Sequence, residues 1–127
     1  MFVDRSGGTR DKTKLNHAVE RVRDKTSIVF FAEGTRSEDG VLRPFKKGAA
    51  IFAIDAQVPL VPAAIAGTHE ILPKGTLAVR PRPAALVVGD PIDTTGKNHD
   101  DREALTEQAH AAVEKLLLQA QRMLQAL

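Results

Sequence analysis

The stretch "FAEGTRS", which ends at Ser37, gathers side chains that are suited to holding a polar ligand. After an apolar run, Glu33 and Gly34 turn the chain, and Gly34 lets a ligand approach the backbone because glycine tolerates a positive φ. Thr35 and Ser37 offer hydroxyls, and the guanidinium of Arg36 is a planar fork of donors that matches a phosphate. The same residues also fit a plain polar turn in which Arg36 pairs with Glu33, so the pattern alone leaves both interpretations open.

More basic side chains lie nearby in the sequence. Arg43, Lys46 and Lys47 follow in "LRPFKKGAA", and Arg5 ends "FVDR" near the N-terminus. If the sheet is parallel, the strand ends that carry Arg5 and residues 33–37 share one edge, the usual ligand crevice of such sheets. Lys46 and Lys47 would start the next helix, where positive charge opposes the helix dipole unless an anion compensates. This pattern indicates an anion site, although a merely solvated lysine pair fits the same residues.

The composition excludes several other kinds of site. The chain has no cysteine, and its four histidines show no spacing such as H-E-x-x-H, so we expect neither a disulfide nor a metal site. Residues 1–48 carry 11 Lys+Arg against 7 Asp+Glu, whereas residues 49–127 carry 7 against 9. The excess in the first part suits an anionic ligand or lipid surface. It is too small to indicate nucleic acid, and without Trp or Tyr there are few platforms for stacking bases.

Short apolar runs alternate with helical stripes, which indicates an α/β layer structure with a mixed or mostly parallel sheet flanked by helices. We predict strands at 2–4, 27–32, 60–66, 77–80 and 84–88, of which 27–32 should be buried. We predict helices from Asp11 or Thr13 to Val22, over 47–57, for one turn at 69–72, and over about 101–125. Asp100 and Glu103 would form a capping box for the last helix. The most apolar window, 49–66, is interrupted by polar residues and prolines, so no segment should cross a bilayer.

Four ordered blocks carry a resemblance to a known family: "FVDR" at 2–5, "FAEGTRS" at 31–37, "PFKKGAA" at 44–50 and "VPLVPAAIAGTHEILPKG" at 58–75. Together they resemble the glycerolipid acyltransferases, whose best-known members are the bacterial 1-acylglycerol-3-phosphate acyltransferases. The resemblance runs from residue 2 to about Ile92, and Ala32 stands where the family usually has proline. It implies the glycerol-phosphate acyltransferase-like α/β fold.

The resemblance also implies a site that binds the substrate phosphate, made of Arg5, Glu33, Gly34, Thr35, Arg36 and Lys46. In it the two arginines would clamp the phosphate, the lysine would add positive charge, and the other three residues would shape the pocket. The apolar block 58–65 is associated in the family with packing and the acyl-donor side. The acceptor would be lysophosphatidic acid or a related lysolipid, and the donor acyl-CoA or acyl carrier protein, with no further cofactor. The implied location is the cytoplasmic face of the cell membrane, by peripheral contact or through an anchor that precedes Met1.

The family's general base does not match any residue of this sequence. That base is a histidine in an H-x-x-x-x-D block before "F-x-x-R", and no histidine here has an aspartate five positions later. The nearest candidate, "NHAVERVRD", has six residues between His17 and Asp24, and is better interpreted as the surface of a helix. We therefore expect residues 1–127 to be a single partial acyltransferase domain, inactive alone, with its catalytic block upstream of Met1. The alternative is a non-catalytic module that binds phosphorylated lipid or a protein partner.

Overall fold

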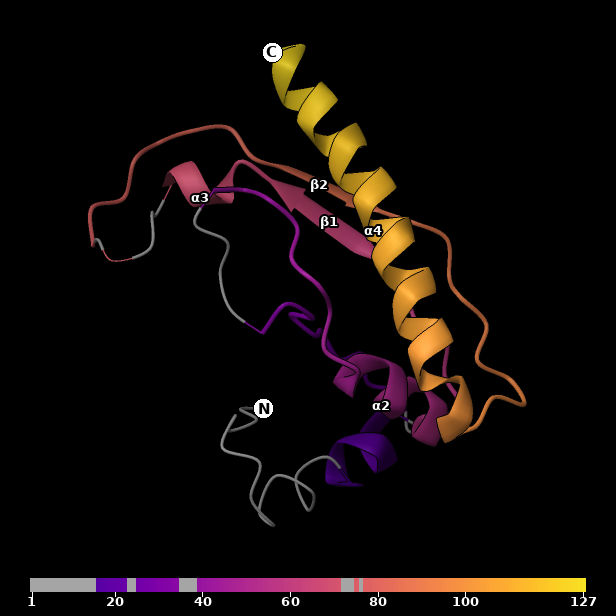
Figure 1. Ribbon diagram of the computed structural model, residues 1–127. Coiled ribbons are helices and arrows are strands. Elements are labelled where there is room, and N and C mark those ends of the chain that lie inside the picture. The colour runs from indigo at the N-terminus through magenta and orange to yellow at the C-terminus, as the bar shows by residue number, and fades with distance from the viewer. Residues whose placement is uncertain (1–15, 23–24, 35–38, 72–74, 76) are drawn as a thin grey trace.

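The computed structural model describes residues 16–22, 25–34, 39–71, 75 and 77–127 (Figure 1). Residues 16–22 are helical. The elements that follow are α2 (Gly48–Ala56), β1 (Ala63–Ala66), α3 (Thr68–Ile71), β2 (Ala85–Val88), the 3-10 turn η1 (His99–Asp101) and α4 (Arg102–Gln125). The long helix α4 runs across both strands and also contacts α2, so it joins the two parts of the structure.

The sheet is an antiparallel pair of strands, β1 and β2, with Ala66 opposite Ala85. An isolated antiparallel bridge between Leu60 and Ile92 continues the same pairing. Side chains alternate between the two faces of a strand, and the two faces differ here. The buried face, which lies under α4, consists of Ala64, Ala66 and Ala85. The opposite face exposes Ile65, Leu86 and Val88.

The 3-10 turn η1, which leads into α4, starts with a reciprocal cap. The Oδ1 atom of Asn98 accepts a hydrogen bond from the N–H of Asp100 at 2.8 Å, and Oδ2 of Asp101 accepts one from the N–H of Asn98 at 2.9 Å. These two bonds satisfy donors at the helix start that have no partner within the helix. The buried stripe of α4 then consists of Leu105, Ala109, Val113 and Ala120.

Small side chains set how closely α4 approaches the sheet. Ala120 is fully buried and packs with Ala66 and Ala85, so three alanines meet at one contact. The larger Leu117 and Leu124 pack around this contact and close it from the sides. Such a contact leaves no room for an added methyl group, because protein interiors are close-packed.

The helix α2 is buried on two sides. On one side, Ile54 packs against Leu105 of α4 in a shared cluster. On the other side, Phe52 packs with Ala18 and with Phe30, whose ring centroid lies 5.2 Å from that of Phe52. α2 therefore connects the α4 layer to the segment that leads into Glu33.

Several elements lie where the sequence predicts them. The helix predicted over 47–57 is α2, the turn predicted at 69–72 is α3, the strand predicted at 84–88 is β2, and the helix predicted over 101–125 is α4. The strand predicted at 60–66 is divided into the Leu60 bridge and β1. Pro62 lies between them and has no N–H to donate to a ladder, although its carbonyl accepts a hydrogen bond from Gly89.

Two predicted strands are wrong, and so is the predicted sheet type. Residues 27–32 and 77–80 are irregular, and Val29 and Phe31 are each 79% exposed. A strand needs a hydrogen-bonding partner, and no described strand pairs with either segment. The described sheet is antiparallel rather than mixed or mostly parallel.

The predicted capping box of Asp100 and Glu103 is also wrong, since the box that the structure shows is formed by Asn98 and Asp101 at the start of η1, and the N-cap of α4 makes no side-chain capping bond. The structure shows why, because Glu103 points instead to Lys47. The strand predicted at 2–4 and the helix start predicted at Asp11 or Thr13 lie outside the described residues.

Candidate functional site

Glu33 and Gly34 form a turn, and the side chain of Lys46 packs against Gly34. The N–H of Gly34 donates to the carbonyl of Phe31 at 2.9 Å, and Gly34 has a φ of +76°. A Cβ at this position would lie 2.8 Å from Cε and 2.9 Å from Nζ of Lys46. The positive φ favours glycine here, and the absence of a Cβ leaves room for the end of the lysine side chain.

Two hydrogen bonds tie the turn to the "PFKKGAA" segment. The N–H of Lys46 donates to the carbonyl of Ala32 at 2.8 Å, and the N–H of Arg43 donates to Oε2 of Glu33 at 3.1 Å. We call this arrangement of residues 31–34 with 43–46 the Glu33–Lys46 corner. The carboxylate of Glu33 has a structural partner in the backbone of Arg43, and the guanidinium of Arg43 pairs with Asp39 at 3.4 Å.

The helix α4 supports this corner from behind. Nε2 of His110 lies 3.1 Å from the carbonyl oxygen of Arg43, and the His110 ring meets the Phe45 ring edge-on at 4.8 Å. Seven residues before His110 on the same helix, Oε1 of Glu103 lies 2.7 Å from Nζ of Lys47. This contact lowers the pKa of Glu103, chiefly through the hydrogen bond from Lys47.

The two lysines at the start of α2 thus have different surroundings. A lysine at a helix start needs an anion that compensates its charge. For Lys47, this anion is the carboxylate of Glu103. Lys46 is exposed, and among the described residues no carboxylate forms an ion pair with it. Among the described residues at this helix start, the ammonium group of Lys46 is therefore better placed than that of Lys47 to meet an external anion.

The Glu33–Lys46 corner borders a large, mainly apolar groove of about 1960 Å³. All eight residues of the 58–65 block line it, and so do the exposed side chains of Val29 and Phe31. The uncovered face of the sheet adds Leu86 and Val88. A charged corner beside a long apolar surface matches an amphiphile better than it matches a wholly polar ligand.

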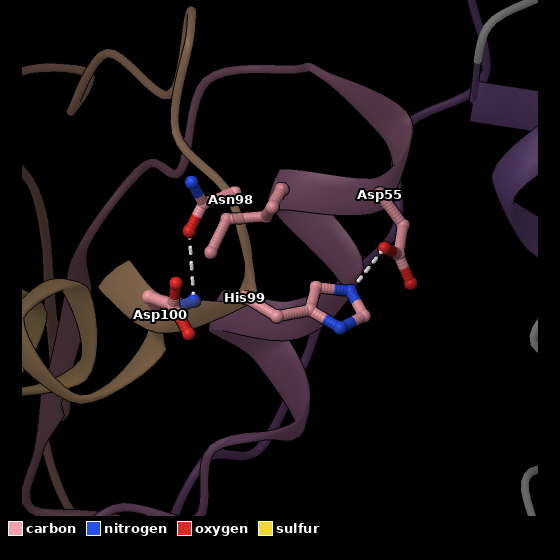
Figure 2. A pocket seen from close by; sticks show the side chains of 5 residues that line it. Asp55, Asn98, His99 and Asp100 are labelled. Atoms are coloured by element: carbon pink, nitrogen blue, oxygen red, sulfur yellow. Dashed lines mark hydrogen bonds and ion pairs between the residues drawn. The ribbon is translucent and has the colours of Figure 1, made fainter.

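A second, shallower pocket lies where η1 meets the end of α2 (Figure 2). There Nε2 of His99 points to Oδ1 of Asp55 at 2.5 Å, while Asn98 and Asp100 form the cap beside it. The pocket shares no lining residue with the groove, so this His–Asp pair does not face the Glu33–Lys46 corner. Its evident effect is to join η1 to α2, since the two residues are 44 positions apart in sequence.

The structure brings together three of the six predicted phosphate-site residues: Glu33, Gly34 and Lys46. The other three, Arg5, Thr35 and Arg36, lie outside the described residues, and their roles stay predictions. Sequence reasoning missed His110 and Glu103. Both are 56 or more positions from the residues that they contact, and no local motif indicates these contacts.

Comparison with known proteins identifies the class of protein. The family model described as "Acyltransferase" matches residues 1–66, about half of the chain, and the chain belongs to this family. None of the described helices has the length and apolar character needed to span a membrane.

Particular relatives are 1-acyl-sn-glycerol-3-phosphate acyltransferases. That of Limnanthes douglasii is 41% identical over 93 residues, which cover 72% of this chain and 33% of the relative. That of Haemophilus influenzae is 31% identical over 121 residues, 91% of this chain and 48% of the relative. The crystal structure of the 1-acyl-sn-glycerophosphate (LPA) acyltransferase PlsC from Thermotoga maritima matches with a TM-score of 0.70 at 32% identity, over 84% of this chain and 45% of that one. The chain thus spans a third to a half of these three relatives.

Proposed function

We propose that this chain supplies the part of a lysophosphatidic acid acyltransferase that binds the phosphate and the acyl tail. The complete enzyme transfers a fatty acyl group from acyl-CoA or acyl carrier protein to the free hydroxyl of 1-acylglycerol 3-phosphate. The observation that carries the proposal is the position of Lys46, which has no ion-pair partner among the described residues, on Gly34 at the border of the apolar groove.

The acceptor has a phosphate at one end and an alkyl chain at the other, which fits the two parts of this site. We infer that Lys46 binds the phosphate together with Arg5 and Arg36, and that Glu33 and Thr35 keep the loop in place. Arginine presents two donors to a phosphate in one plane, which a lysine cannot do. The acyl tail would lie along the groove, where removal from water contributes about 0.8 kcal/mol per buried methylene group.

The chemical step needs a general base that accepts the hydroxyl proton while the hydroxyl oxygen attacks the thioester carbonyl. The carbon–sulfur bond then breaks, and the thiol leaves with a proton, so no oxidant and no covalent acyl-enzyme is involved. General base catalysis of this kind contributes typically about 10²–10⁴-fold. We assign the base to an H-x-x-x-x-D block, which is absent from residues 1–127. These residues alone should therefore bind the acceptor without turning it over.

A second candidate is a non-catalytic module that binds phosphorylated lipid. The same absence of an H-x-x-x-x-D block favours it, and the His99–Asp55 pair does not replace that block because it faces a different pocket. The two candidates differ in whether a base is encoded next to this segment. Translating the gene in frame upstream of Met1 and searching for H-x-x-x-x-D separates them.

The proposed function is tested by binding and turnover on the same samples. Isothermal titration of the chain with lysophosphatidic acid should show binding that lysophosphatidylcholine, which offers no terminal phosphate monoester, does not reproduce. Thiol release from acyl-CoA plus lysophosphatidic acid should stay at the level without protein. Equal binding of both lysolipids would overturn the phosphate site, and clear thiol release would show that a base lies within these residues.

Arg36 gives the sharpest mutational test in a version of the protein that contains the catalytic block. Arg36→Ala should lower kcat/KM by about 10²-fold or more, because each hydrogen bond to a charged group contributes about 1.5–3 kcal/mol. Arg36→Lys should restore part of the loss, and Arg5→Ala should combine with Arg36→Ala less than additively if both hold one phosphate. Unchanged kinetics with a lower melting temperature would instead support the plain polar turn.

A further inference from the structure

Residues 77–83, which we call the 77–83 strip, expose apolar side chains to an unusual degree. Leu77 is 98% exposed and Val79 is 68% exposed. Arg80, Arg82 and both prolines of the strip are exposed as well. Single exposed apolar side chains are common, but several that lie together on one surface indicate an interaction site.

The strip is held on a fixed base, although it belongs to no sheet. The N–H of Arg80 donates to the carbonyl of Ile71 at 2.7 Å, which joins the strip to the end of α3. Pro81 and Pro83 stiffen the chain and have no N–H groups. A segment with fewer unpaired backbone donors loses less free energy when it leaves water for an apolar medium.

The strip lies at the same end of the molecule as the last turns of α4 (Figure 1). The carbonyl of Pro83 and a methyl group of Leu124 both border Gly67, within 3.0 Å of where its Cβ would be. The last turns of α4 add two further exposed apolar side chains, Met123 and Leu127. Exposed apolar groups from two separate segments therefore lie in the part of the molecule away from α2 and η1.

Charged side chains are distributed unevenly between the strip with the C-terminal part of α4 and the segment that leads into α4. Residues 77–89 and 115–127 contain no aspartate or glutamate, and their cations are Arg80, Arg82, Lys115 and Arg122. The segment from 90 to 107 instead carries six carboxylates. Glu70, on α3, is the nearby exception, and its carboxylate lies 4.0 Å from His69. Among the residues that the structure describes, no carboxylate forms an ion pair with Arg80 or Arg82.

We propose that the 77–83 strip, together with the last turn of α4, is a surface that docks on an anionic lipid bilayer. Leu77 and Val79 enter the apolar boundary of the bilayer, and Arg80 and Arg82 contact lipid phosphates. Apolar insertion combined with cationic contacts is the usual basis of interfacial binding. A second copy of this chain is a poor occupant, because two such surfaces would bring four arginines of the strips together without a counter-charge.

The surface adjoins the groove, since Arg82 and Pro83 line both. This adds a role to the proposed function, because a lysolipid in the same leaflet would lie beside the groove. Docking itself does not depend on acyl transfer, and it is measured here without any lysolipid.

A tryptophan reporter tests the insertion directly, because the chain has no tryptophan of its own. Leu77→Trp should show a blue shift and quenching by brominated lipid when vesicles of phosphatidylcholine with phosphatidylglycerol are added. Ala104→Trp, at an exposed position near the start of α4, should show neither. An unchanged spectrum of Leu77→Trp, or an equal change at both positions, would overturn the proposal.

Charge variants test the second half of the proposal by co-sedimentation with the same vesicles. Arg80→Gln and Arg82→Gln should each weaken binding about fivefold, which corresponds to about 1 kcal/mol for a basic residue near an anionic surface. Arg21→Gln, an exposed arginine outside the strip, should have no effect. Equal binding to vesicles of phosphatidylcholine alone, or vesicle-independent dimerisation that Leu77→Ser abolishes, would contradict the proposal.

The two proposals fail separately. Loss of lysophosphatidic acid binding in Lys46→Ala, with vesicle binding intact, supports the docking surface as an independent feature. If lysophosphatidic acid binding to the unmodified chain fails while vesicle binding persists, the proposed function is overturned and the docking surface stands. The reverse result overturns the docking surface alone.

Discussion

The β1–β2–α4 layer and the Glu33–Lys46 corner are held together by different forces. In the layer, Ala120 packs against Ala66 and Ala85 with no polar group involved. In the corner, the backbone N–H groups of Arg43 and Lys46 donate to Glu33 and Ala32, and Nε2 of His110 contacts the carbonyl of Arg43. The layer depends on shape, whereas the corner depends on a few directed contacts between segments far apart in sequence.

This difference predicts that substitutions in the two regions have separable effects. A change of volume in the layer or in the α2–α4 contact should lower the free energy of unfolding. A change of a polar group in the corner should leave that free energy nearly unaltered and alter ligand binding. The following predictions test this separation, from the largest expected effect to the smallest.

Leu105→Ala should have the largest effect on stability. Leu105 is 1% exposed and packs against Ile54 and Ile92, so its truncation leaves a cavity between α2 and α4. Such substitutions cost about 2–5 kcal/mol. Urea denaturation measures the loss, and Leu118→Ala, at a half-exposed position of the same helix, is the control. Equal losses for both variants would contradict the assigned core.

Ala120→Leu should have the second-largest effect on stability, because it adds volume to the core where Leu105→Ala removes it. Ala120 is completely buried where α4 packs against the two strands, so added methyl groups would force the helix away from the sheet. Overpacking of this kind costs about 1–3 kcal/mol. Ala111→Leu, on the exposed side of the same helix, should change the free energy of unfolding by less than about 0.5 kcal/mol. If Ala120→Leu is as stable as the unmodified chain, the contact is looser than described.

Lys46→Ala should weaken the binding of lysophosphatidic acid about tenfold, because it removes a charged donor from the proposed phosphate site. The neighbouring Lys47→Ala is a matched control, since Lys47 is engaged by Glu103. Titration calorimetry measures the affinities, and thermal melting should show that Lys46→Ala is folded. Equal losses of affinity in both variants would mean that general charge, rather than the corner, attracts the ligand.

His110→Ala should weaken the same binding by about fivefold, the value of one hydrogen bond, because the backbone of Arg43 loses its contact with α4. His110→Gln keeps an N–H donor and should restore most of the affinity. A purely structural role predicts instead that both variants lose stability and that binding to the folded fraction is unchanged. This comparison tests whether α4 positions the corner.

Glu103→Gln should have the smallest effect, confined to acidic conditions. Lys47 lowers the pKa of Glu103 in the folded chain below the 4.5 of an ordinary glutamate, so the ionised form stabilises the fold. That stabilisation is complete above the unfolded pKa and is lost as the pH falls through the lowered folded pKa. Glu103→Gln should therefore reduce the decline of the melting temperature below about pH 4.5. If the melting temperatures of both proteins decline equally at acidic pH, the Lys47–Glu103 pair contributes nothing to stability.

The sequence predicted the elements whose determinants are local. The apolar stripe from Leu105 onward was enough to predict α4, and the "PFKKGAA" block placed Lys46 at the start of α2. The "SIVFFA" run looked equally clear, but a strand exists only through its partner, and none of the described strands pairs with it. Local composition does not indicate whether a strand has a partner.

The sequence predicted three residues that the structure places together in the candidate site, and it did not predict the contacts that support them. The family blocks named Glu33, Gly34 and Lys46, which the structure brings together. The contact from His110 to Arg43 joins positions 67 residues apart, and only the three-dimensional packing of α4 creates it. Likewise, Asn98 and Asp101 form a capping box for η1 and the predicted pair of Asp100 and Glu103 does not, because residues of similar capping ability lie close together in sequence and the chain path decides between them.

The position of Arg82 and Pro83, shared by the groove and the 77–83 strip, affects how a substrate would be found. If the strip rests on a bilayer, lysolipid molecules reach the groove by diffusing within the plane of the leaflet rather than through water. The relevant concentration is then the mole fraction of lysolipid in the surface. Diluting that surface with inert lipid would lower the rate of encounter even when the total amount of lysolipid in the sample stays the same.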